Sequence, residues 1–277
     1  MDTDCDDAGA LLMLINAHKE GKINLSGVIA DSICAHAAPF CKSVLTYYGL
    51  DLPVGEIYSH IEVTQRHGAY LEHQKRCVGR AHNKELCLRN GRIYPSTEAY
   101  IKLLSEAHDG GVTVLCVGML SALAEAIKAR SDLFERKVKE IVVMGNPYKE
   151  NDFNFSMDAR ATREFFELCP CPVTVSYEGS DVITGQYLDK TLDADNPIRR
   201  AYEIWTDGQG RSSWDLIATL FAMEQNNGLF EVRDVGKISY DEKKRVSYID
   251  KSERAHRVIS LGGRDKEVQE ILNGLLK

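Results

Sequence analysis

Residues 112–144, VTVLCVGMLSALAEAIKARSDLFERKVKEIVVM, decide the fold of this chain. An apolar run at 112–117 predicts a strand, helical spacing at 120–129 predicts a helix, and a second apolar run at 138–144 predicts a buried strand. A strand, a helix and another buried strand in this order are typical of a βαβ unit in a parallel sheet. In such sheets, ligands bind beyond the carboxyl ends of the strands.

The same alternation continues on both sides of this unit. It predicts helices at residues 7–18, 37–48, 158–168, 214–223 and 267–276, and strands at residues 25–30 and 172–176. Residues 230–259 alternate like a β-hairpin around a turn at 241–244. Polar residues 57–95 break the pattern and are expected to cross one rim of the sheet, where long excursions often form lids. We therefore expect one α/β domain, residues 1–277, with a Rossmann-like, mostly parallel sheet flanked by helices.

The composition narrows the class of protein. With 44% hydrophobic residues among 277, the chain can bury a full core, and its net charge of −7 argues against nucleic acid or an anionic membrane as partner. The apolar stretch at residues 8–15 is too short for a membrane span and follows acidic residues, which is unlike a signal peptide. We expect a soluble cytoplasmic protein whose eight cysteines, without a CxxC pair, are buried reduced thiols.

The chain opens with four aspartates in seven residues, MDTDCDD, directly before a predicted helix. One or two carboxylates at a helix start have an ordinary role, because they accept hydrogen bonds from free N–H groups and face the positive end of the helix dipole. Four carboxylates within six residues repel one another, so either they are solvated or a cation lies among them. The spacing alone leaves both interpretations open. A hard divalent cation takes about six to eight oxygens, which one loop rarely supplies.

A second acidic feature lies far downstream, in GRSSWDLIATLFA at residues 210–222, where Asp215 begins a predicted helix. On its own, Asp215 is an ordinary acid at a helix N-terminus. Together with DTDCDDAGAL it resembles the calcium signature of the nucleoside hydrolases, which cleave N-ribosides. Four further segments resemble motifs of that family in the same order: LCVGMLSALAEAI at 115–127, IVVMGNP at 141–147, NDFNFSMDARAT at 151–162 and DNPIRRAYEIW at 195–205. GRSSWD resembles a branch in which Trp precedes the late aspartate.

The resemblance implies a calcium site whose ligands are Asp7, Asp215, the backbone carbonyl of Ser121 and either Asp2 or Asp4. Asp2 reproduces the family's offset from the acidic pair, whereas a literal D-x-D match makes Asp4 the ligand, and both alternatives stay open. The same residue, Asp2 or Asp4, matches the catalytic base. Asp6 matches the acid that holds a ribose hydroxyl.

The implied activity is hydrolysis of the N-glycosidic bond of a nucleoside or related riboside. This bond breaks through an oxocarbenium-like state, so the site should surround the sugar with carboxylates and deliver an activated water. The implied calcium would orient that water and lower its pKa, and an aspartate would take its proton. Asn154 and Asp152 match residues that hold the ribose 5′ end, and Glu178 falls near another acidic position of the family. Trp214 would stack on the base.

Two departures from the family pattern favour an alternative, a catalytically impaired relative that binds ribosides or calcium. Family members begin with an apolar strand, whereas Met1 stands directly before Asp2 here, so an N-terminal strand is expected to be missing. Cys34 stands where the family has an Asn facing the sugar. A third departure, Ser121-Ala122 in place of Thr-Asn and Asn146 in place of the second Gly of MGG, keeps the carbonyl ligand. Other branches have a His at the position of Trp214 that protonates the leaving base. The candidate acids here are histidines of the polar excursion, namely His67, His73 and His82. The resemblance also implies a homo-oligomer.

Overall fold

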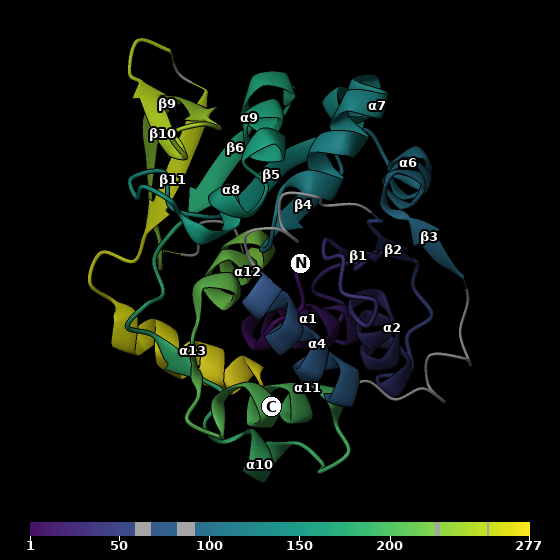
Figure 1. The fold of residues 1–277 in the computed structure, drawn as a ribbon. Helices are drawn as coiled ribbons and strands as arrows, with labels where there is room; N and C mark the ends of the chain where they lie inside the picture. The colour runs from purple at the N-terminus through teal and green to yellow at the C-terminus, as the bar shows by residue number, and fades with distance from the viewer. Residues whose placement is uncertain (59–67, 82–91, 225–227, 254) are drawn as a thin grey trace.

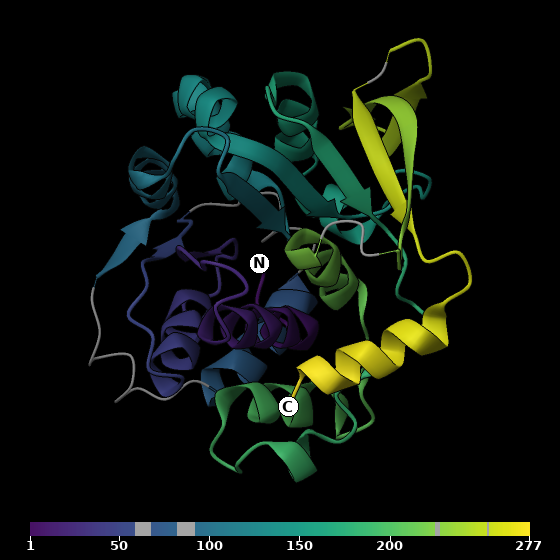
Figure 2. The same cartoon turned by 180° about the vertical axis from the view of Figure 1, so that it is seen from behind.

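The computed structural model describes residues 1–58, 68–81, 92–224, 228–253 and 255–277, and has helices on both sides of a mostly parallel sheet (Figures 1 and 2). The helices are α1 (Cys5–Lys19), α2 (Ala37–Tyr47), α4 (Gly68–Ala81), α6 (Ser96–Glu106), α7 (Ser121–Lys137), α8 (Phe153–Met157), α9 (Ala159–Leu168), α10 (Leu188–Thr191), α11 (Pro197–Thr206), α12 (Trp214–Glu224) and α13 (Asp265–Leu275). The strands are β1 (Val28–Ala30), β2 (Val54–Glu56), β3 (Ile93–Pro95), β4 (Val112–Cys116), β5 (Val138–Met144), β6 (Val173–Ser176), β7 (Ile183–Thr184), β8 (Arg211–Ser212), β9 (Glu231–Asp241), β10 (Val246–Asp250) and β11 (His256–Ser260).

The strands form a six-stranded sheet, a three-stranded sheet and a short pair. The first has the order β10-β9-β11-β6-β5-β4, in which the four strands from β11 to β4 are parallel. In the second, β1, β2 and β3 are all parallel, while β7 and β8 form an antiparallel pair. The βαβ unit predicted at residues 112–144 is confirmed as β4, α7 and β5, and with it the prediction of a mostly parallel sheet.

The opening residues lie between the two parallel groups of strands, at the centre of the molecule (Figure 1). Met1 runs beside the end of β1, because its amino group donates to the Ile29 carbonyl at 3.1 Å and its own carbonyl accepts from Asp31 N at 2.8 Å. On the other side, Gly118 follows β4 and packs on Asp2 so closely that a Cβ there would lie 2.6 Å from Asp2 N. Asp2 is therefore buried between β1 and β4. The missing N-terminal strand stays a prediction.

Helix α1 carries the acidic opening into the interior. It packs against α12 and α11, and apolar side chains around its whole circumference are buried: Leu11, Leu12, Met13 and Ile15. A helix that is apolar all round is a core helix. The aspartates at its N-terminus consequently lie inside the protein.

The structure corrects several predicted boundaries. Helix α7 continues to Lys137 through a kink at Arg130, and the strand predicted over 25–30 is confined to Val28–Ala30. The hairpin predicted around the turn at 241–244 is confirmed as the antiparallel pair β9 and β10, but residues 230–259 also contain β11, which lies between β9 and β6 and pairs with both. This position buries Val258 and Ile259.

The polar excursion at 57–95 contains α4 and β3, which pairs with β2. Helix α4 packs against α11 and α2. The lid stays a prediction, and His60, His67 and His82 lie outside the described residues. No helix in the described part of the chain is long and apolar enough to cross a membrane. The seven described cysteines are free thiols, of which two are partly exposed, Cys34 and Cys169.

Candidate active site

The aspartates at the start of α1 hold the opening turn together. Asp4 is the N-cap of α1 and accepts a hydrogen bond from Asp6 N at 3.1 Å. Asp7 reaches back and accepts from Asp4 N at 3.1 Å and from Asp2 N at 3.0 Å. Between them, Thr3 has a φ of +74°, a conformation that a β-branched residue rarely adopts. This strained turn points the backbone N–H groups of Asp2 and Asp4 at the Asp7 carboxylate. The aspartates at the start of α1 therefore do have the ordinary capping role.

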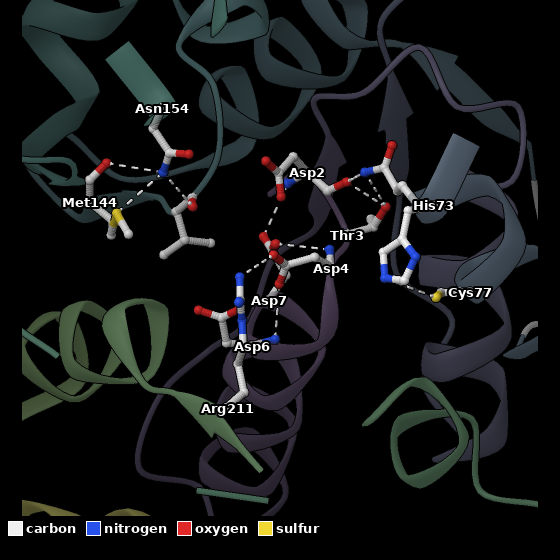
Figure 3. A network of polar contacts seen from close by, with 12 residues as sticks. Asp2, Thr3, Asp4, Asp6, Asp7, His73, Cys77, Met144, Asn154 and Arg211 are labelled. Atoms are coloured by element: carbon white, nitrogen blue, oxygen red, sulfur yellow. Dashed lines mark hydrogen bonds and ion pairs between the residues drawn. The ribbon is translucent and has the colours of Figure 1, made fainter. Parts of the chain in front are cut away.

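Capping does not account for the whole cluster, which Figure 3 shows in close-up. Carboxylate oxygens of Asp2, Asp4 and Asp7 lie within 4.8 Å of one another. Asp215 at the start of α12 adds a fourth charge that acts on Asp2 and Asp4, and Asp6 a fifth; none of the five is more than 7% exposed. Burial raises the pKa of Asp2 to about 6. Burial and then the neighbouring carboxylates raise the pKa values of Asp6, Asp7 and Asp215 well above the ordinary range.

These carboxylates fit a divalent cation. Buried charges of one sign are unfavourable unless protons or an opposite charge neutralise them. Oxygen donors come here from two distant segments, the opening turn and the start of α12, which together supply more ligands than one loop. Asp2, Asp4, Asp7 and Asp215 would hold the ion. The hydroxyl of Ser121, at the start of α7, donates to Asp158 at 2.9 Å, and the role of its carbonyl as a ligand stays a prediction.

The raised pKa of Asp2 predicts an unusual dependence of stability on pH. Without divalent cations, the melting temperature should fall as the pH rises from about 4 to about 6. In this window the folded state keeps a proton that the unfolded state, with a pKa near ~3.9, has lost. The loss should be on the order of 2–3 kcal/mol for this group. Added calcium should restore stability above about pH 6 and have little effect near pH 4, as thermal unfolding with calcium or with EDTA would show. A melting temperature that rises through this window would contradict the burial of Asp2 as a neutral acid.

Gln74 of α4 fixes the position of Asp2 and was not predicted. Its amide nitrogen donates to the Asp2 carbonyl and, at 3.3 Å, to Thr3 Oγ1. Its amide oxygen accepts from Ser32 Oγ at 2.8 Å, just beyond β1. The Tyr70 hydroxyl, also from α4, is buried, and burial followed by the charges of the opening carboxylates raises the pKa of Tyr70. No short-range sequence signal marks these residues, because they approach the aspartates only in the folded chain.

Asn154 lies at the carboxyl ends of the parallel strands, as the family resemblance requires. Its Nδ2 donates to the Val117 carbonyl at 3.1 Å, just after β4, and lies 3.4 Å from the Met144 carbonyl at the end of β5. Figure 3 shows Asn154 across from the aspartates. Asp152 caps α8 through Phe155 N at 3.2 Å, and burial raises its pKa. A sugar-binding role for both residues stays a prediction.

Trp214 and Glu178 both form hydrogen bonds with other residues of the protein. The Trp214 indole donates to Ser180 Oγ at 3.2 Å. The two carboxylate oxygens of Glu178 accept from Ser260 Oγ at 2.8 Å and from Leu261 N at 2.5 Å. Glu178 thus links the segment after β6 to the end of β11. A hydrogen bond between Glu178 and a substrate would have to replace one of these two hydrogen bonds. Its role in substrate binding stays a prediction.

His73 is the one candidate acid among the three histidines that the structure describes. Its Nδ1 lies 2.6 Å from Arg76 Nη2, and its ring contacts Trp205. Burial and then the Arg76 charge lower the pKa of His73. A histidine with a lowered pKa is neutral near pH 7 and is a poor proton donor for a leaving group.

Comparisons with known proteins identify the family and the fold. Residues 1–262 match the family described as inosine-uridine preferring nucleoside hydrolase. Among solved structures, such a hydrolase from Bacillus anthracis shares the fold with a TM-score of 0.74 and 15% identity, over 99% of this chain and 97% of that one. The plant nucleoside hydrolase PpNRh1 gives 0.70 and 15% over 100% and 96%. The type III effector XopQ, solved with adenosine diphosphate ribose, gives 0.66 and 13% over 100% and 90%. No protein of curated function matches the sequence.

The family match covers most of the chain and supports an N-ribosyl hydrolase activity, and the structural similarities, which span nearly all of the chain, support the fold. This chain belongs to the inosine-uridine preferring nucleoside hydrolase family.

Proposed function

We propose that this chain hydrolyses the N-glycosidic bond of a nucleoside or related riboside, with calcium as its cation. The observation that carries the proposal is the cluster of five buried aspartates, contributed by the start of α1 and the start of α12. Capping of α1 explains part of the role of Asp4 and Asp7, but it does not explain why Asp215 is buried near them. When bound, a divalent cation supplies the charge that orients ribose hydroxyls and the attacking water and lowers the pKa of that water.

Asp2 is the base in this proposal. Both carboxylate oxygens of Asp4 already accept hydrogen bonds, one from Asp6 N and one from the Arg211 guanidinium at 3.1 Å. Asp2 is held through its backbone by Gln74 and Gly118. Its carboxylate interacts with the side chains of Asp7 and Tyr70, and no arginine among the described residues pairs with it as Arg211 does with Asp4. A fixed main chain and a carboxylate without an arginine partner suit a general base.

The remaining residues would bind the substrate. Asp6 would accept a hydrogen bond from a ribose hydroxyl, and Asn154, across from the aspartates in Figure 3, would hold the 5′ end of the sugar. Carboxylates around the sugar stabilise the positive charge of the oxocarbenium-like transition state. The half-buried indole of Trp214 offers a face for the base to stack on.

The test is release of reducing sugar from a panel of purine and pyrimidine ribosides, with calcium or with EDTA. We expect at least one riboside to be cleaved, and EDTA to remove most of the rate. The matched 2′-deoxyribosides, which lack a hydroxyl that the cation and Asp6 would bind, should be cleaved at least about tenfold more slowly. Ribosides that bind without sugar release at any calcium concentration would instead establish the catalytically impaired alternative. The contact of Arg211 with Asp4 favours that alternative, because it already neutralises part of the cluster.

A further inference from the structure

Arg211 places a guanidinium beside the acidic cluster, on Asp4 and Asp6. Its Nη2 lies 3.1 Å from Asp4 Oδ2 and its Nε lies 3.2 Å from Asp6 Oδ1 (Figure 3). The backbone of Arg211 is fixed by the β7–β8 pair, where Thr184 is its partner. Gly210 before it has a φ of +81°, and a Cβ there would lie 2.8 Å from the Thr184 carbonyl. The position of Arg211 beside α1 is therefore built into the fold.

Arg211 forms ion pairs with carboxylates that a divalent cation would also need as ligands or neighbours. Asp4 belongs to both groups of closely spaced donors, one with Asp2 and Asp7 and the other with Cys5 and Asp6. One Asp4 oxygen accepts from Asp6 N in the helix cap and the other from Arg211, so an ion at Asp4 would share these oxygens with both donors and would lie close to the guanidinium charge. The guanidinium is the partner that can leave, because the cap is part of α1. A positive charge this close to the ion would also repel it.

The side chain of Arg211 can move away from the aspartates toward solvent and Trp214. It is 32% exposed, whereas those of Asp4 and Asp6 are 9% and 4% exposed, so the guanidinium approaches the cluster from the solvent side. Its centre already lies 5.2 Å from the centroid of the Trp214 indole. A guanidinium over an indole face is a favourable cation–π contact. Rotation of the side chain toward Trp214 would release the carboxylates without a change in the backbone.

We propose that Arg211 is an internal counter-ion that occupies Asp4 and Asp6 in the metal-free protein, gives them up when a divalent cation binds, and so sets the affinity of the site for metal. The inference rests on the proposed function, because it assumes that the aspartates hold a divalent cation. Two effects of opposite sign follow for loss of the charge at position 211. The metal-free protein loses stability, since its carboxylates repel one another more, whereas the metal binds more tightly. A residue that only clamps the aspartates in place would lower both quantities.

The experiment compares R211Q and R211K with the parent and with R163Q as the matched control. Arg163 has the same side-chain exposure, 32%, and also contacts carboxylates, those of Glu164, Glu167 and Glu242. Calcium affinity is measured by calorimetry, and in a W205F background by the emission of Trp214, which is then the single tryptophan. Thermal unfolding of each variant is followed with and without calcium.

We expect R211Q to bind calcium at least about tenfold more tightly than the parent and to melt at a lower temperature without metal. R211K, which keeps the charge, and R163Q should both bind calcium like the parent. Calcium should also change Trp214 emission in the parent more than in R211Q, because the guanidinium moves only in the parent. Equal or weaker calcium binding by R211Q would overturn this inference and leave the proposed function intact. Calcium binding by none of the variants would overturn both.

Discussion

Replacement of Asp215 by asparagine is expected to abolish stabilisation by calcium and to lower riboside cleavage by at least about a hundredfold. Asp215 is 3% exposed and interacts electrostatically with Asp4 and Asp2. Asparagine has nearly the same size, so the change removes a charge from the cluster without opening a cavity. Without calcium, D215N should melt at a higher temperature than the parent near pH 7, because one source of repulsion is gone. Thermal unfolding with and without calcium and the reducing-sugar assay measure these effects.

The matched control for D215N is D265N. Asp265 lies in the first turn of α13, which like α12 is an 11-residue helix. Asp265 shares the favourable interaction with a helix N-terminus, but it is partly exposed and does not belong to the buried acidic cluster. D265N should therefore lose a few tenths of a kcal/mol to about 1 kcal/mol and keep both calcium binding and cleavage. If D215N behaved like D265N, Asp215 would be an ordinary helix acid and the metal site would be wrong.

The pairing of Asp215 with the opening aspartates could be predicted because it depends on motifs. The resemblance to the family depends on acidic residues at the starts of two helices, and these can be recognised without knowing the structure of the chain between them. The same holds for Asn154, which follows a strand end and lies at the common edge of the parallel strands. Long-range support of the site could not be predicted. Gln74 reaches Asp2 from a polar segment without periodic pattern, and Arg211 pairs with Asp4 across more than two hundred residues.

The fold could be predicted where elements are long and apolar. Strand β5 matches its predicted bounds, 138–144, and lies between Lys137 and Gly145. Strands β2 and β3 have three residues each, too few to show a period, and were missed. Helix α11 has Asn196 as its N-cap and Pro197 in its first turn, signals by which it could have been predicted. The order of β9, β11 and β6 depends on tertiary packing and has no local signal.

Replacement of Gly118 by alanine is expected to displace Asp2 and to lower riboside cleavage by about a hundredfold, with a loss of stability of about 1–3 kcal/mol. The added Cβ would lie 2.6 Å from Asp2 N and 3.0 Å from Asp2 Cβ. The opening segment is also held by hydrogen bonds to Gln74 and to the end of β1. Asp2 therefore cannot move away from the added methyl group without breaking those hydrogen bonds. The reducing-sugar assay and calcium-dependent melting measure the result.

G274A is the matched control for G118A. Gly274 lies in α13, where an added Cβ would meet nothing within 4 Å, so alanine should be neutral or stabilising by up to about 1 kcal/mol. G118A and G274A add the same methyl group, and only the first is directed at Asp2. The comparison also decides between the two candidate bases. If G118A kept the parental rate and the parental response to calcium, Asp2 would be neither base nor ligand, and Asp4 would have to fill both roles after release from Arg211.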